Sequence, residues 1–139
     1  RDEETKPSRS LLACCVVHDV PCSASWIHLG ELEKVWKLYS KFDLSKAAFR
    51  PYWEEGCPVH VDKPLLTSAY EQRNRLIMVA NLSSRAAKGT LRVEASKLRV
   101  AGKPVVRNEV TGRVLDVPLD AIPVTLPDRD YTVVSVTWP

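Results

Sequence analysis

The chain of 139 residues is long enough for one ordinary domain, and its 45% hydrophobic content and net charge of +3 are typical of a globular protein. No apolar run approaches the roughly 20 residues that a membrane-spanning helix needs, so we expect no membrane span. The polar first residues do not form a signal peptide, and no compartment is assigned. Four cysteines are too few for a disulfide scaffold.

Basic side chains gather in one part of the chain. Residues 85–113 hold eight of them against two acidic side chains, a local charge of +6. Such a surface can attract polyanions. However, these charges are spaced along predicted strands, where every second side chain faces water. We therefore expect a solvated face and no nucleic-acid partner, with a polyanion site as the alternative.

The first part of the chain predicts a leader followed by a buried strand. Residues 1–10 are polar and are predicted to be a flexible leader. Residues 11–17 are apolar on both faces, as in a strand of a parallel sheet that is covered by helices. His18 and Asp19 come directly after this run. They would then lie at the carboxyl end of a strand, where open sheets and α/β barrels bind ligands.

An amphipathic helix is predicted after a loop over residues 21–28. Apolar residues recur at helical spacing between residues 29 and 42, with Trp36 on the apolar face and charged residues opposite. Residues 11–50 therefore read as one strand–loop–helix unit of an α/β fold. Because one such unit cannot close a sheet, we expect it to be the last repeat of a larger fold or to dock on the second half of the chain.

The second part, residues 51–139, predicts an antiparallel β-sandwich. Its centre is the apolar run at residues 75–82, which has turn-forming residues at both ends. About eight short strands follow one another at spacings near ten residues, and turns separate them. The fold class is thus mainly β, a sandwich preceded by one β/α unit. Further strands are predicted at residues 59–61, 66–71, 90–95 with Leu98 and Val100 on the same face, 104–107, 114–115, 122–126 and 131–138.

Three residues are candidates for binding a substrate. His18 can transfer a proton near neutral pH, and Asp19 can orient it or bind a sugar hydroxyl. Trp53 could stack on a pyranose ring, as could Tyr52, Trp26 and Trp138. The alternative for His18 and Asp19 is that they only complete a loop. For Tyr52 and Trp53 the favoured interpretation is burial in the seam between the helical unit and the sandwich.

No cofactor is predicted, although one metal-binding alternative stays open. Cys15 with His18, and Cys57 with His60, form two pairs with zinc-like spacing. The sequence has no Gly-rich phosphate loop, no Gly-x-Ser-x-Gly elbow and no pair of catalytic carboxylates on one element. A complete catalytic set is therefore not predicted.

The order of these motifs resembles the C-terminal region of a TIM-barrel glycoside hydrolase. In that family a last barrel strand and helix lead through a Phe-x-Pro-Tyr-Trp segment into a C-terminal β-sandwich. The matching segments here are His18-Asp19, the helix that ends at Phe42, Phe49 to Trp53, Leu76 to Leu82, Asn108 to Gly112 and Leu126 to Tyr131.

The resemblance implies an accessory role and not catalysis. Family members carry their catalytic carboxylates on earlier barrel strands, so no catalytic residue is carried over. The chain is expected to be a piece of a longer protein, with the rest of that protein or a partner packed against residues 11–42. The alternatives are a non-catalytic component of a larger assembly and a carbohydrate-binding module, which would need coplanar exposed aromatic side chains.

Overall fold

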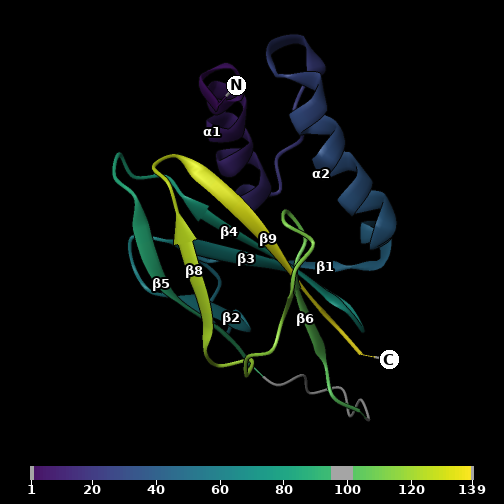
Figure 1. The fold of residues 1–139 in the computed structure, drawn as a ribbon. Coiled ribbons are helices and arrows are strands. Elements are labelled where there is room, and N and C mark those ends of the chain that lie inside the picture. The colour runs from purple at the N-terminus through teal and green to yellow at the C-terminus, as the bar shows by residue number, and fades with distance from the viewer. Residues whose placement is uncertain (1, 95–101, 139) are drawn as a thin grey trace.

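The computed structural model describes residues 2–94 and 102–138. Within these residues the chain forms two α-helices and nine strands, with a short 3-10 helix after each α-helix (Figure 1). The helices are α1 (Asp2–His18), η1 (Ala24–Trp26), α2 (Leu29–Lys41) and η2 (Leu44–Lys46). The strands are β1 (Ala48–Arg50), β2 (Val59–Val61), β3 (Leu66–Glu71), β4 (Arg75–Asn81), β5 (Ala87–Val93), β6 (Val105–Asn108), β7 (Val114–Leu115), β8 (Ile122–Leu126) and β9 (Asp130–Thr137).

The described strands form two antiparallel sheets, which confirms the mainly β prediction. The larger sheet has the strand order β1-β3-β4-β9-β6-β7, and the smaller has the order β2-β5-β8. Strand β4 is the predicted apolar run and lies in the middle of the larger sheet. Ile77 pairs with Ala69 of β3 on one side and with Val134 of β9 on the other. All seven residues of β4 are buried, as expected for a central strand covered on both faces.

The smaller sheet covers one face of the larger sheet, and the helices cover the other (Figure 1). Alternation along β4 directs Leu76, Met78 and Ala80 to the helices and Ile77 and Val79 to the smaller sheet. Strand β9 alternates in the same way. The molecule therefore has two apolar cores, one on each side of a shared sheet.

The strand predicted at residues 11–17 is wrong, because these residues belong to α1. An apolar run of this length fits a buried helix as well as a strand. The helix buries Leu12, Ala13, Val16 and Val17 on the sheet and leaves Leu11 exposed. These four buried residues follow the spacing i, i+1, i+4 and i+5, which places them on one face of a helix.

The flexible leader over residues 1–10 is also wrong for its described part, since α1 starts at Asp2. Residue 50 is not a boundary between two packing units either. Strand β1 pairs with β3, and both helices share a core with the larger sheet. The predicted strand–loop–helix unit over residues 11–50 is therefore replaced by two helices and a short strand. Leu98, Val100 and the side chain of Trp26 lie outside the described residues.

Helix α2 confirms the helix predicted at residues 29–42. The side chains that it buries differ in part from the predicted apolar face. The buried apolar side chains are Leu32 and Val35, and Leu38 and Tyr39 are partly buried. Trp36 was predicted to be in the core and instead is 46% exposed. No described helix is long and apolar enough to cross a membrane.

Candidate functional site

The turn that ends α1 positions His18 and Asp19. The Val20 N–H donates a hydrogen bond to the carbonyl of Cys15 at 3.0 Å, and Asp19 between them has a φ of 56°. This is the Schellman arrangement of a helix C-terminus, in which the left-handed position usually holds glycine. An aspartate there carries a local conformational cost and places a carboxylate next to His18.

His18 lies in a fixed orientation between two partners. Its Nδ1 is 2.6 Å from the carbonyl of Cys14, and its Nε2 is 2.9 Å from the hydroxyl of Tyr52. Because a carbonyl can only accept, Nδ1 carries the hydrogen, and in the neutral imidazole Nε2 is the acceptor for the Tyr52 hydroxyl. The Trp53 ring stacks on the imidazole, with ring centroids 5.7 Å apart and planes 22° apart.

Asp19 is joined to the same cluster through buried aromatic side chains. The Tyr70 hydroxyl donates a hydrogen bond of 2.6 Å to Oδ1 of Asp19. Burial raises the pKa of Tyr70, and the neighbouring Tyr39 and Asp19 raise it further, so the hydroxyl stays protonated as a donor. Phe49 lies between Tyr70 and Trp53, with its ring centroid 5.2 Å from the first and 6.3 Å from the second.

Ser68 of β3 connects the end of α1 to the loop after β1. Its buried hydroxyl donates to the carbonyl of Val17 at 2.8 Å and accepts from the Tyr52 N–H at 3.1 Å. The end of α1 and the loop after β1 are therefore held by the same side chain. We call His18, Asp19, Tyr52 and Trp53 the aromatic cluster. All three predicted substrate-binding residues, His18, Asp19 and Trp53, belong to it.

The aromatic cluster is on the surface, which contradicts the predicted buried seam. Tyr52 is 37% exposed and Trp53 is 58% exposed. Their rings meet edge to face at 88°, so they are not a coplanar pair of platforms. Beside them is a hollow of about 220 Å³ whose lining includes Tyr52, His60 and Lys63. The neighbouring polar side chains His60 and Lys63 could not be assigned to this site from the sequence, because they come from a separate strand and turn.

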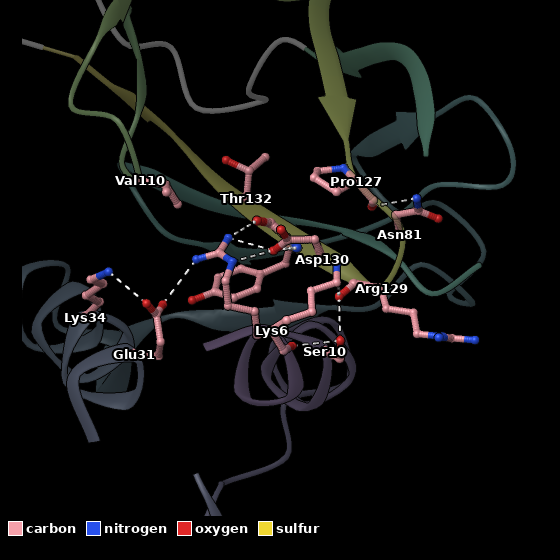
Figure 2. A network of polar contacts seen from close by, with 12 residues as sticks. Lys6, Ser10, Glu31, Lys34, Asn81, Val110, Pro127, Arg129, Asp130 and Thr132 are labelled. Atoms are coloured by element: carbon pink, nitrogen blue, oxygen red, sulfur yellow. Dashed lines mark hydrogen bonds and ion pairs between the residues drawn. The ribbon is translucent and has the colours of Figure 1, made fainter. Parts of the chain in front are cut away.

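A second feature, on the far side of α1, anchors the helix to the sheet (Figure 2). Arg9 donates from Nε to Asp130 at 2.8 Å, from Nη2 to the Tyr131 carbonyl at 3.1 Å and from Nη1 to Glu31 at 3.2 Å. Lys34 pairs with Glu31 at 3.0 Å, and Lys6 donates to the backbone carbonyl of Asp128. Since Glu31 and Asp130 are only 6% and 8% exposed, Arg9 supplies the charge that makes their burial tolerable.

A third feature is an apolar line on the outer edge of α2. Leu29 and Trp36 are 53% and 46% exposed, and their spacing of seven residues places them on one line of the helix. Glu33, Lys37, Ser40 and Lys41 form an open hollow with Trp36. Trp36 therefore presents apolar surface to solvent between charged side chains.

The family model of the glycoside hydrolase 123 C-terminal domain matches residues 31–111, more than half of the chain. The chain belongs to this family. No curated protein matches the chain. The glycoside hydrolase 123 match includes Trp36, Tyr52 and Trp53, and it runs from α2 to the end of β6.

The zinc alternative has no support in the described part of this glycoside hydrolase 123 C-terminal domain. Cys15 lies against Cys22, and Cys57 is buried and donates to the Arg50 carbonyl at 3.7 Å. His60 Nε2 is 3.1 Å from a carboxylate oxygen of Glu94. Among described residues, no three His, Cys, Asp or Glu side chains are grouped to hold a metal ion.

Proposed function

We propose that this chain is an accessory domain that supports the catalytic part of a glycoside hydrolase and does not itself carry out hydrolysis. The family match supports the accessory position, since the matched model describes a C-terminal domain. The catalytic part is then the partner that packs against this domain.

Three carboxyl groups of this domain are unsuited to the proton donation that glycoside hydrolysis needs. Glycoside hydrolysis uses two facing carboxyl groups, one of which has a raised pKa so that it can donate a proton. Here the pKa of Glu31 is lowered: burial opposes the shift, but the hydrogen bonds and charges of Lys34 and Arg9 outweigh it. The pKa values of Asp43 and Asp62 are lowered too, chiefly by hydrogen bonds from Ser45 and from the Thr90 N–H. These three groups are held ionised, which is the reverse of what a proton donor needs.

The observation that carries the proposal is the apolar line of α2. Leu29 and Trp36 are half-exposed on the edge of α2, beside the stripe that the helix buries on the sheet. Trp36 lies inside the matched segment. Burying one indole face against a second domain would remove much of this apolar surface from water, which favours association.

The test uses a complete glycoside hydrolase that contains this domain. Trp36→Ala is expected to lower the melting temperature of the catalytic part by a few degrees and to leave the Michaelis constant unchanged. Trp53→Ala is the matched control, because it also removes an exposed indole but lies outside the apolar line. An unchanged melting temperature in Trp36→Ala, or equal losses in both variants, would contradict docking through α2. Docking onto a different protein would instead leave the single enzyme chain unaffected.

A second candidate function, contact with carbohydrate, is favoured by the aromatic cluster. Trp53 is stacked on His18 on one face and is 58% exposed, and Asp19 follows His18 directly in the chain. A fixed indole with polar side chains beside it suits a sugar ring, whose CH groups stack and whose hydroxyls accept and donate hydrogen bonds. Loss of the ring in Trp53→Ala is expected to weaken oligosaccharide binding about tenfold, the equivalent of ~1.4 kcal/mol. Calorimetric titration with oligosaccharides measures this, and equal affinity in both proteins would exclude the contact.

A further inference from the structure

Cys15 and Cys22 meet beside the aromatic cluster. Their Sγ atoms are 3.1 Å apart, although Cys15 is in α1 and Cys22 is in the loop that follows. The turn at Asp19 explains the approach. Its left-handed conformation reverses the chain after His18, and the loop then returns alongside the last turns of the helix.

The other two cysteines have different surroundings. Cys14 is exposed, and its sulfur is 3.9 Å from Nδ1 of His18. Cys57 is 3% exposed in the other core, between β1 and β2. Cys15 and Cys22 are both half-buried, so each sulfur has a thiol neighbour and a route to solvent. A disulfide bond needs its sulfur atoms about 2.05 Å apart, and the required movement falls on the irregular loop that holds Cys22.

We propose that Cys15 and Cys22 form a reversible disulfide bond. The bond closes a ring over residues 15–22 that contains His18 and Asp19. It would fasten the end of α1 to the following loop and thereby fix the base of the aromatic cluster. This proposal does not depend on the proposed docking partner, because both cysteines belong to the same turn of this chain.

The oxidant is a small-molecule disulfide, such as glutathione disulfide. A thiolate of one cysteine attacks it, forms a mixed disulfide and releases one glutathione thiolate. The thiolate of the second cysteine then attacks the protein sulfur of the mixed disulfide, forms the Cys15–Cys22 bond and releases the second glutathione. Two protein thiols are oxidised, one glutathione disulfide is reduced to two thiols, and the protons released at the protein are taken up by glutathione or buffer. Burial and the hydrogen bond with Cys22 raise the pKa of Cys15 to about 12, so the exchange is faster in alkaline buffer.

The experiment incubates the 139-residue chain with glutathione disulfide, alkylates the remaining thiols and measures the intact mass. The expected product has lost two hydrogens and takes up two alkyl groups after denaturation, at Cys14 and Cys57. Its melting temperature is expected to rise by about 5 °C, because the ring restricts the unfolded chain, and dithiothreitol should reverse the rise.

Three variants identify the bonded pair. Cys14→Ser is expected to lose two hydrogens as the parent does, whereas Cys22→Ser and Cys15→Ser are not. Cys22→Ser changes a loop position and keeps the test valid if Cys15→Ser does not fold. A chain that stays reduced in excess glutathione disulfide would overturn the proposal, and so would loss of the bond in Cys14→Ser. A bond that lowers the melting temperature would also overturn it.

Discussion

The two faces of the larger sheet pack against cores of different amino-acid composition. The core under the smaller sheet consists mainly of aliphatic side chains such as Ile77, Leu91 and Val134. The core under the helices contains Tyr70, Tyr131 and Phe42 among its aliphatic residues and is crossed by polar links such as the Arg9 network. Both cores depend on apolar packing. The first has buried polar residues at the ends of β4, where Arg75 pairs with Glu71, and the second contains the Arg9 network, which links α1 to α2 and to β9.

The proposed functional groups all belong to the helix-covered side. The aromatic cluster, the apolar line of α2 and the cysteine pair each include residues of a helix or of the loop that follows it. In our proposal the sandwich supplies most of the packing, and the helices with their adjoining loops carry the surfaces proposed for recognition. Four predictions test this division, each with a contrast between the two sides or within the helical side.

The largest effect is expected from neighbouring residues of β4 that face opposite cores. Ile77→Ala should cost about 4 kcal/mol of the free energy of unfolding, because close-packed strands cannot move in to fill the cavity. Met78→Ala should cost less, about 2–3 kcal/mol, since the helices can shift toward the sheet. Urea unfolding of both variants measures the two costs. The reverse order would show that the helix-covered core is the more tightly packed one.

The next effect concerns ion pairs on the two sides. Arg9→Ala leaves the buried carboxylates of Glu31 and Asp130 without their cation and should cost about 3 kcal/mol in urea unfolding. The matched control is Arg92→Ala, which breaks an exposed pair with Asp62 over the smaller sheet. Exposed pairs contribute little, so this variant should unfold almost as the parent does. Similar losses in both variants would contradict the difference between the two sides.

A third prediction concerns Asp19 in its left-handed position. Asp19→Gly and Asp19→Ala both lose the hydrogen bond from Tyr70, but only alanine keeps the backbone penalty. Asp19→Ala should therefore be less stable than Asp19→Gly by about 1 kcal/mol. Thermal unfolding of the two variants gives the difference. Equal stability would mean that the turn after α1 relaxes when its side chain is changed.

The smallest effect is expected from the pH dependence of the Arg9 network. The pKa of Glu31 is lower in the folded state than its ordinary value, because Lys34 and Arg9 outweigh the effect of burial. Its ionised form therefore stabilises the fold above the unfolded pKa, and this contribution is lost as the pH falls through the folded pKa. The stability difference between the parent and Glu31→Gln should shrink as the pH falls through and below the ordinary pKa of glutamate. A difference that grows toward acid pH would contradict the direction of the shift.

The sandwich could be predicted from the sequence because its strands have a clear period of two. In β9 the alternation correctly places Tyr131 and Val133 on one face and Val134 and Val136 on the other. The larger sheet's central strand was identifiable because apolar residues run through β4 without a break. These are local patterns, and local patterns are what a sequence displays directly.

The helical side was harder to predict for physical reasons. The apolar run before His18 is too short to distinguish a buried helix from a strand, and α1 continues it through polar residues that read as a leader. Trp36 fits the apolar spacing of α2, yet the sheet covers only the stripe through Leu32 and Val35. Which edge of a helix stays uncovered depends on the tertiary packing.

The candidate site was predicted in part. His18, Asp19 and Trp53 were selected by residue type and position, and the structure brings them into one cluster by way of Tyr70, Phe49 and Ser68. The local structure around His18 differs from the prediction, because His18 lies at the C-terminus of a helix and not at the end of a strand. The pairing of Cys15 with Cys22 was not visible in the sequence, because the turn between them has no glycine to mark it.

The most direct test of the accessory role is a hydrolysis assay on the 139-residue chain, folded and freed of other proteins. The substrates are a panel of chromogenic glycosides, and circular dichroism confirms that the chain is folded before the assay. The account predicts no release of the chromophore above the buffer rate, while a complete glycoside hydrolase 123 enzyme turns over its substrate in the same assay. Turnover that follows the purified chain through successive columns would contradict the account.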